Sequence, residues 1–90
     1  MPKFILIHTP GKELTMEIAE PFAKAIKAHH TTDAYWVRSW YVREEGRLYC
    51  EWDAKNPESM REVIAKIAPD FANDEIYELE YTVNSEDFRE

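Results

Sequence analysis

YWVRSWYVREEGRLYCEWD, residues 35 to 53, is the stretch that decides the fold. Both of its ends are dense in aromatic and β-branched residues, which favour strands. The sequence EEG at 44–46 separates the two ends and fits a three-residue hairpin loop with Gly46 in the left-handed conformation. The stretch therefore predicts a β-hairpin with strands over 35–43 and 47–53.

The predicted loop also fixes which residues of the hairpin face each other. With three residues in the loop, Trp40 lies opposite Cys50 on one face of the hairpin, and Tyr41 lies opposite Tyr49 on the other. The first face is apolar and is expected to pack against helices. Cys50 is therefore expected on the helix side of the sheet, away from Glu51.

Two further elements are predicted on each side of the hairpin. Before it, the apolar run 3–8 is typical of a strand, and helical spacing of apolar residues over 15–30 predicts a helix that Pro21 kinks or restarts. After it, the sequence Asn-Pro-Glu at 56–58 offers a capping side chain, a proline at the first helical position and an early acid, which together favour a helix start. The alternating stretch 76–83 predicts the last strand.

The resulting order is β-α-β-β-α-β, which is the order of the ferredoxin-like fold. We therefore predict an α+β protein with a four-stranded antiparallel sheet and two helices on one of its faces. The other face has no cover within the chain, and the predicted register places Tyr35, Val37, Tyr41 and Tyr49 on it beside acids. Such a face is a candidate interaction surface, and we expect the same face of a second copy to cover it, giving a homodimer.

Length and composition limit the classes of protein that this chain can represent. Ninety residues suit a single domain, predicted over 1–83 with an acidic C-terminal tail over 84–90. A net charge of -7 argues against nucleic acid as a partner, and the sequence lacks an apolar run of the roughly 20 residues needed to span a membrane. With only two glycines there is no phosphate-binding glycine loop and hence no expected nucleotide cofactor. The single cysteine excludes an intramolecular disulfide, so a reducing, cytoplasmic location is expected.

The chain resembles a family of small prokaryotic ferredoxin-like proteins over about residues 1–83. The resemblance rests on the opening stretch 1–8, on the hairpin with Trp40, and on GRLYCEWDA at 46–54 followed by a short helix. Many members are of unknown function, and some are described as nickel-binding. The wider superfamily, the dimeric α+β barrels, also contains cofactor-independent monooxygenases and haem-degrading enzymes. Members often carry a histidine in the second helix, where this chain has Val-Ile-Ala at 63–65.

A divalent metal, nickel above all, is what the resemblance implies, and the residues offer candidate ligands for it. His8 ends the first strand and Cys50 lies in the strand that the fold places beside it. An imidazole and a thiol suit nickel or zinc, and Glu51 or Asp53 would complete the site. The competing interpretation is that Cys50 is a small buried hydrophobe. The sequence leaves open which face His8 points to.

An acidic cluster is a second candidate site. Glu51, Glu78 and Glu80 fall on one face of the predicted sheet, where they could bind a hard cation or form a solvated edge.

Three functions remain on this sequence. The first is a dimeric protein that binds a divalent metal, with a binding role rather than a catalytic one. The second is a cofactor-independent monooxygenase-like enzyme with a cavity between sheet and helices, in which His8 or a tyrosine serves as the acid-base group. The third is an interaction module that only dimerises.

Overall fold

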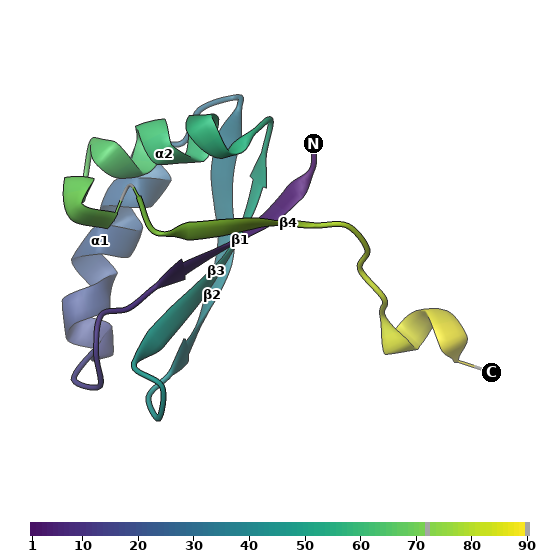
Figure 1. Cartoon of the computed structure of the whole chain (residues 1–90), viewed down its shortest axis with the longest axis horizontal. Coiled ribbons are helices and arrows are strands. Elements are labelled where there is room, and N and C mark those ends of the chain that lie inside the picture. The colour runs from purple at the N-terminus through teal and green to yellow at the C-terminus, as the bar shows by residue number, and fades with distance from the viewer. Residues whose placement is uncertain (72, 90) are drawn as a thin grey trace.

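Four antiparallel strands form one sheet in the computed structural model, which describes residues 1–71 and 73–89 (Figure 1). The strand order across the sheet is β2-β3-β1-β4, so β1 lies between β3 and β4. The strands and helices, in chain order, are β1 (Lys3–His8), α1 (Met16–Ala28), β2 (Ala34–Val42), β3 (Arg47–Ala54), α2 (Pro57–Ala65) and β4 (Glu75–Leu79). The predicted α+β fold and its β-α-β-β-α-β order are confirmed.

The core lies between the sheet and the helices, which cover the same face of the sheet (Figure 1). Alternate strand residues point into it, and α2 contributes three buried side chains; the largest fully buried ones are Trp52, Leu6, Met60, Ile64 and Val63. By contrast, α1 buries none of its residues completely, and its Phe22 remains 45% exposed. No helix among the described residues has the length and apolar character needed to cross a membrane.

Both helices begin where the sequence predicts. The hydroxyl of Thr15 accepts a hydrogen bond from the backbone N–H of Ile18, and the side chain of Asn56 accepts one from the N–H of Ser59. These contacts satisfy N–H groups that have no partner inside the helix. Pro21 lies within α1 without ending it, and the helix stops at Ala28, two residues before the predicted end.

The hairpin loop is one residue longer than predicted, which changes the register. Val42 pairs with Arg47, so the loop spans residues 43–46, and Gly46 has the predicted left-handed conformation, with φ of 67°. Cys50 therefore lies opposite Ser39, and the predicted pairing of Trp40 with Cys50 is wrong. A bulge between Trp36 and Arg38 then shifts the register again further along β2.

The new register exchanges two aromatic side chains between the faces of the sheet. Tyr41 turns to the helix side, where its hydroxyl donates to the backbone carbonyl of Gly11 at 2.5 Å. Trp40 instead points to the uncovered side and is 50% exposed. We call this uncovered side the open face; its residues are Lys3, Ile5, Ile7, Tyr35, Arg38, Trp40, Val42, Arg47, Tyr49, Glu51, Asp53, Glu75, Tyr77 and Leu79.

The C-terminal segment leaves the body of the molecule. Strand β4 ends at Leu79, four residues before its predicted end. Beyond it the chain runs away from the sheet and closes with a 3-10 turn over Ser85–Phe88 (Figure 1). We call residues 80–89 the arm; the predicted tail over 84–90 includes Glu90, which lies outside the described residues.

Candidate metal site

His8 is a buried imidazole with a fixed orientation. It is the last residue of β1 and points to the helix side, where its ring lies 5.1 Å from that of Phe71. Its Nδ1 lies 2.6 Å from a carboxylate oxygen of Asp74. Because a carboxylate only accepts, Nδ1 carries the hydrogen and donates it, and Nε2 is left with a free lone pair in the neutral ring. The structure thus resolves the orientation that the sequence left open.

Strand topology brings Asp74 to His8. β4 runs antiparallel to β1, so the residues just before β4 lie beside the end of β1. Arg61 of α2 helps to hold this loop by donating to the backbone carbonyl of Asp74 at 3.2 Å. A small open depression of about 170 Å³ lies beside Asp74 and is lined by Ile7, Thr9, Arg47, Asn73, Asp74 and Glu75, whereas His8 does not line it. Asp74 is therefore partly exposed to solvent, whereas His8 is buried.

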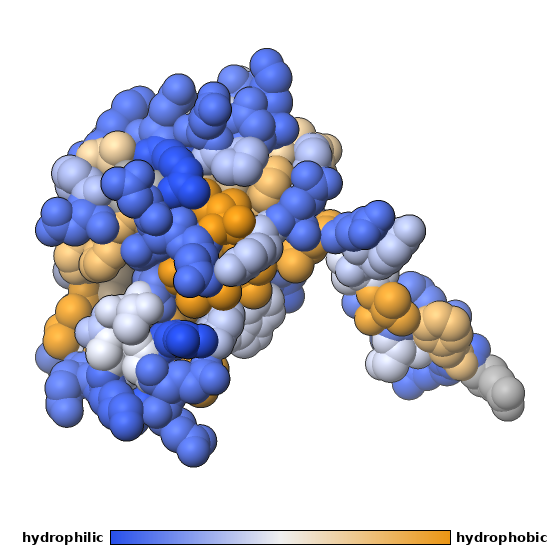
Figure 2. Space-filling view, viewed as in Figure 1, coloured by the Kyte–Doolittle hydropathy of each residue, from blue (hydrophilic) through white to orange (hydrophobic). Residues whose placement is uncertain are grey.

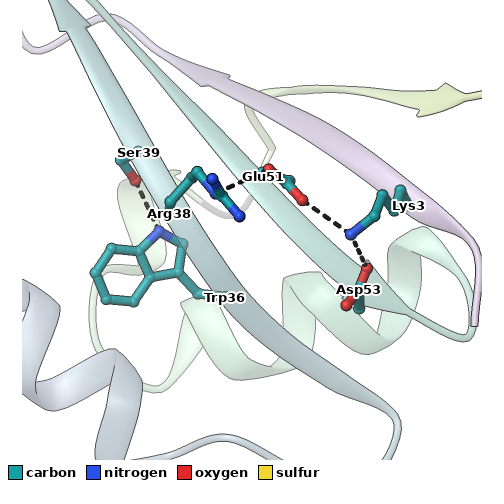
Figure 3. Close-up of polar contacts among 6 residues, drawn as sticks. All are labelled: Lys3, Trp36, Arg38, Ser39, Glu51 and Asp53. Atoms are coloured by element: carbon teal, nitrogen blue, oxygen red, sulfur yellow. Dashed lines mark hydrogen bonds and ion pairs between the residues drawn. The ribbon is translucent and has the colours of Figure 1, made fainter. Parts of the chain in front are cut away.

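Cys50 lies in the core on the same side of the sheet as His8. It is 5% exposed, and the hydroxyl of Ser39 donates to its sulfur at 3.0 Å. Ser39 in turn accepts from the indole N–H of Trp36 at 2.7 Å (Figure 3). Burial raises the pKa of the Cys50 thiol to about 11, against a smaller lowering by Ser39. The thiol is protonated at neutral pH and, in this state, behaves as the small buried hydrophobe of the competing interpretation.

Glu51 and Asp53 lie on the opposite side of the sheet, where cations already hold them. The Nζ of Lys3 lies 2.8 Å from Glu51 and 2.9 Å from Asp53 (Figure 3). Arg38 adds a contact of 3.3 Å to Glu51. Hydrogen bonds to both acids raise the pKa of Lys3, so the ammonium stays charged. Burial acts to raise the pKa of Asp53, but hydrogen bonds with Lys3 and Tyr35 outweigh it and lower the value.

The sheet therefore divides the four residues predicted as ligands. His8 and Cys50 point to the helix side, whereas Glu51 and Asp53 belong to the open face. Within residues 1–71 and 73–89, no group of three or more His, Cys, Asp or Glu side chains is arranged to hold a metal ion. A single described chain thus offers one well-oriented imidazole and no complete ligand set.

The predicted acidic cluster does not form. Glu78 lies opposite Phe4, which is a core residue, whereas Glu51 lies opposite Ile5 on the open face. The two acids thus point to different sides of the sheet. Glu80 follows the end of β4 and belongs to the arm. Side chains alternate between the two faces along each strand. Because Glu51 and Glu78 pair with neighbouring residues of β1, they point to opposite faces of the sheet.

Asp74 is the residue of this site that the sequence analysis missed. It lies 66 positions from His8, and no local motif marks it. The available signal was topological: in this fold the last strand runs antiparallel to the first, so residues just before it meet the end of the first strand.

The open face carries no net charge although the chain carries -7. Its three cations and three anions balance: Lys3, Arg38 and Arg47 against Glu51, Asp53 and Glu75. Its remaining eight residues are aliphatic or aromatic, and Tyr77 and Trp40 are each at least half exposed. The excess acid of the chain therefore lies elsewhere on the molecule.

Comparisons with known proteins place the chain in a family. A family model described as nickel responsive protein SCO4226-like matches residues 4–79. The crystal structure of SCO4226 from Streptomyces coelicolor A3(2) superimposes with a TM-score of 0.71 at 18% sequence identity. The match covers 90% of this chain and 99% of that chain, which supports the fold. None of the curated proteins matches the chain. Since the family model spans most of the sequence, the chain belongs to the SCO4226-like family of nickel-responsive proteins.

Proposed function

We propose that this protein is a small homodimer that binds a divalent transition metal, nickel first of all, in a binding rather than a catalytic role. The observation that carries the proposal is the buried imidazole of His8, held by Asp74 at 2.6 Å. Histidines that bind metals usually donate their other ring N–H to a carboxylate, which fixes the tautomer and orients the free nitrogen. An imidazole nitrogen is a suitable ligand for nickel.

The proposed site uses one protein ligand from the single chain, and water would have to supply the other ligands. The Nε2 of His8 would hold the ion and Asp74 would orient the ring. Glu51 and Asp53 are unsuitable partners, because they face the other side of the sheet and are paired with Lys3. Cys50 could join only after losing a proton, which its raised pKa disfavours.

The proposed dimer forms through the open face. Eight aliphatic and aromatic residues on a sheet face make a surface that a partner sheet can cover. The zero net charge of the open face lets a second copy approach without the repulsion that a total of -7 per chain would otherwise cause. A two-fold dimer of this kind is isologous, so the same residues lie on both sides of the interface.

A binding role is favoured over an enzymatic one by the packing of the interior. A monooxygenase-like enzyme needs room for an apolar substrate between sheet and helices. In the described residues that space holds core side chains such as Leu6, Trp52 and Met60, each no more than 1% exposed.

We also propose that the protein works in the reducing cytoplasm. Cys50 is its single cysteine and is a free, buried thiol. Disulfides are rare in that compartment, so a protein without them needs no oxidising environment to fold.

The test is native mass spectrometry of the untagged protein with added nickel, before and after a chelator. We expect a dimer that gains nickel and loses it to the chelator. His8→Ala should abolish uptake, and Asp74→Asn should weaken it about 10- to 100-fold, the usual effect of removing such an orienting partner. His29→Ala is the matched control, because His29 is exposed and its ring bonds to the backbone carbonyl of Ala25. The metal proposal is wrong if the dimer takes up no nickel, or if His8→Ala binds as much as His29→Ala.

A further inference from the structure

The arm, residues 80–89, exposes apolar side chains that its own chain does not cover. Tyr81, Val83 and Phe88 are 83%, 76% and 73% exposed. Figure 2 shows this apolar surface at the far end of the molecule, beyond the sheet and apart from the body. An extended segment with three large apolar residues in water loses the free energy that their burial would contribute.

The arm is also an addition to the family domain. The family model ends at residue 79, and β4 ends at Leu79, so the arm begins where the family match stops. The arm holds neither glycine nor proline, the residues that most readily turn a chain back on itself. Its composition instead favours an extended path, with Tyr81, Thr82 and Val83 in succession.

We propose that the arm packs on a second copy of this chain, along strand β2 of that copy. β2 is an edge strand of the sheet: Thr31 and His30 hydrogen-bond to the backbone of its first residues, Ala34 and Trp36, and no other strand within residues 1–71 and 73–89 pairs with its outer side. Extended segments bind such edges through backbone hydrogen bonds. β2 also presents three exposed apolar side chains, Tyr35 at 39%, Trp40 at 50% and Val42 at 36%. These can cover the apolar residues of the arm.

Charge favours β2 over the other exposed apolar residues of the helices and strands, which lie on α1 and on the second edge strand, β4; β4 carries Tyr77 and Leu79 but also the acids Glu75 and Glu78. The described arm carries three acids, Glu80, Glu86 and Asp87, against one base, Arg89. The one charged residue of β2 is Arg38, whose side chain contacts Glu51 at 3.3 Å and is still 63% exposed. On α1, by contrast, the exposed apolar residues Met16, Ile18 and Phe22 stand among two acids and two bases, Glu17 and Glu20 with Lys24 and Lys27, so this helix has no net charge to attract the arm. The arm is therefore directed to β2 by both apolar contact and charge.

This inference rests on the homodimer proposed above and specifies a second contact within it. In a two-fold dimer, both arms cross, so each copy gives one arm and receives one. Phe88→Ala should then weaken the dimer about tenfold or more, as expected from losing a buried aromatic ring. Phe22→Ala is the matched control: it removes an aromatic ring of α1 that is 45% exposed and should leave the dimer unchanged.

The direct test is a photo-crosslink from the arm in the otherwise intact chain. Phe88→p-benzoylphenylalanine keeps an aromatic ring and adds a photoreactive group. On irradiation we expect a covalent dimer, and trypsin digestion should show residue 88 joined to the peptide 39–43, which contains Trp40 and Val42. A crosslink within one chain, or to α1, would overturn the inference.

Native mass spectrometry of the same sample separates the two proposals. A dimer that gives no crosslinked product shows that the arm is not seated on the second copy, which overturns the inference and leaves the homodimer standing. A monomer overturns both. If the photoreactive variant gives the crosslinked dimer but Phe88→Ala dimerises with unchanged affinity, the arm contact does not stabilise the dimer, and this also counts against the inference.

Discussion

Replacement of Trp40 by alanine should dissociate the homodimer. Trp40 lies on β2 within the open face and is the largest side chain there, with half of its surface exposed in the single chain. Its neighbour across the strands is Tyr49. Aromatic side chains at the centre of an interface carry a large share of the binding free energy.

The size of the effect follows from the exposed area. A fully covered aromatic side chain buries about 150–250 Å², so a half-exposed Trp40 leaves on the order of 100 Å² for a partner. At about 25 cal/mol per Å² this area is worth about 2.5 kcal/mol. Both copies contribute one tryptophan, which gives about 5 kcal/mol per dimer. Because alanine keeps part of the contact, Trp40→Ala should raise the dimer Kd on the order of a thousandfold.

Sedimentation velocity over a dilution series measures this Kd directly. Phe22→Ala serves as the control, since Phe22 is similarly exposed but lies on α1, away from the open face. Circular dichroism of both variants checks that the fold is kept. If Trp40→Ala dimerises as tightly as the unmodified chain, or if both variants weaken the dimer equally, the open face is not the interface.

Three further predictions concern the stability and reactivity of the single chain. Because burial raises the pKa of Cys50 from 9.0 to about 11, alkylation at pH 8 should be about a hundredfold or more slower in the native protein than in the unfolded chain, as followed by intact mass. Lys3→Met should cost about 1 kcal/mol in urea unfolding at pH 7, after solvent screening. Because the pKa of Asp53 is lowered in the folded protein, its pairing stabilises the fold above its unfolded pKa of about 3.9. The cost of Lys3→Met should therefore shrink as the pH falls through the folded pKa of Asp53. Gly46→Ala should lower the free energy of unfolding by about 1–3 kcal/mol, which is more than Gly11→Ala should. Both glycines have positive φ, but only at Gly46 would an added Cβ meet backbone, 3.0 Å from the carbonyl carbon of Gly11.

The order of elements could be predicted from the sequence because each one carries a local signal. The cap of α2 at Asn56, the cap of α1 at Thr15 and the left-handed Gly46 are all local features, and all three are as predicted. The register was predicted wrongly because loops of three and four residues that end in glycine look alike in sequence. A change of one residue reverses the face of every side chain between the loop and the bulge, which is why Trp40 and Tyr41 changed places.

The candidate site was predictable only in part. His8 was identified from its chemistry, but its partner Asp74 comes from a distant loop and is defined by strand pairing rather than by any motif. Glu51 and Asp53 had suitable chemistry as well. Their contacts with Lys3, which lies 48 and 50 residues away, depend on the register between β1 and β3, and no single segment of the sequence carries that register.

Because the sheet separates the proposed metal site from the proposed interface, the two can be tested independently. His8 points to the helix side, whereas Trp40 points to the open face. If His8 and water alone hold nickel, Trp40→Ala should bind as much nickel per chain as the unmodified protein, even at dilutions where it is monomeric. If nickel is instead lost together with the dimer, the second copy must supply ligands, and the single-imidazole site is wrong. If nickel needs only one chain to bind, it cannot control dimerisation through these groups. Such control would require nickel binding and dimerisation each to change the affinity of the other.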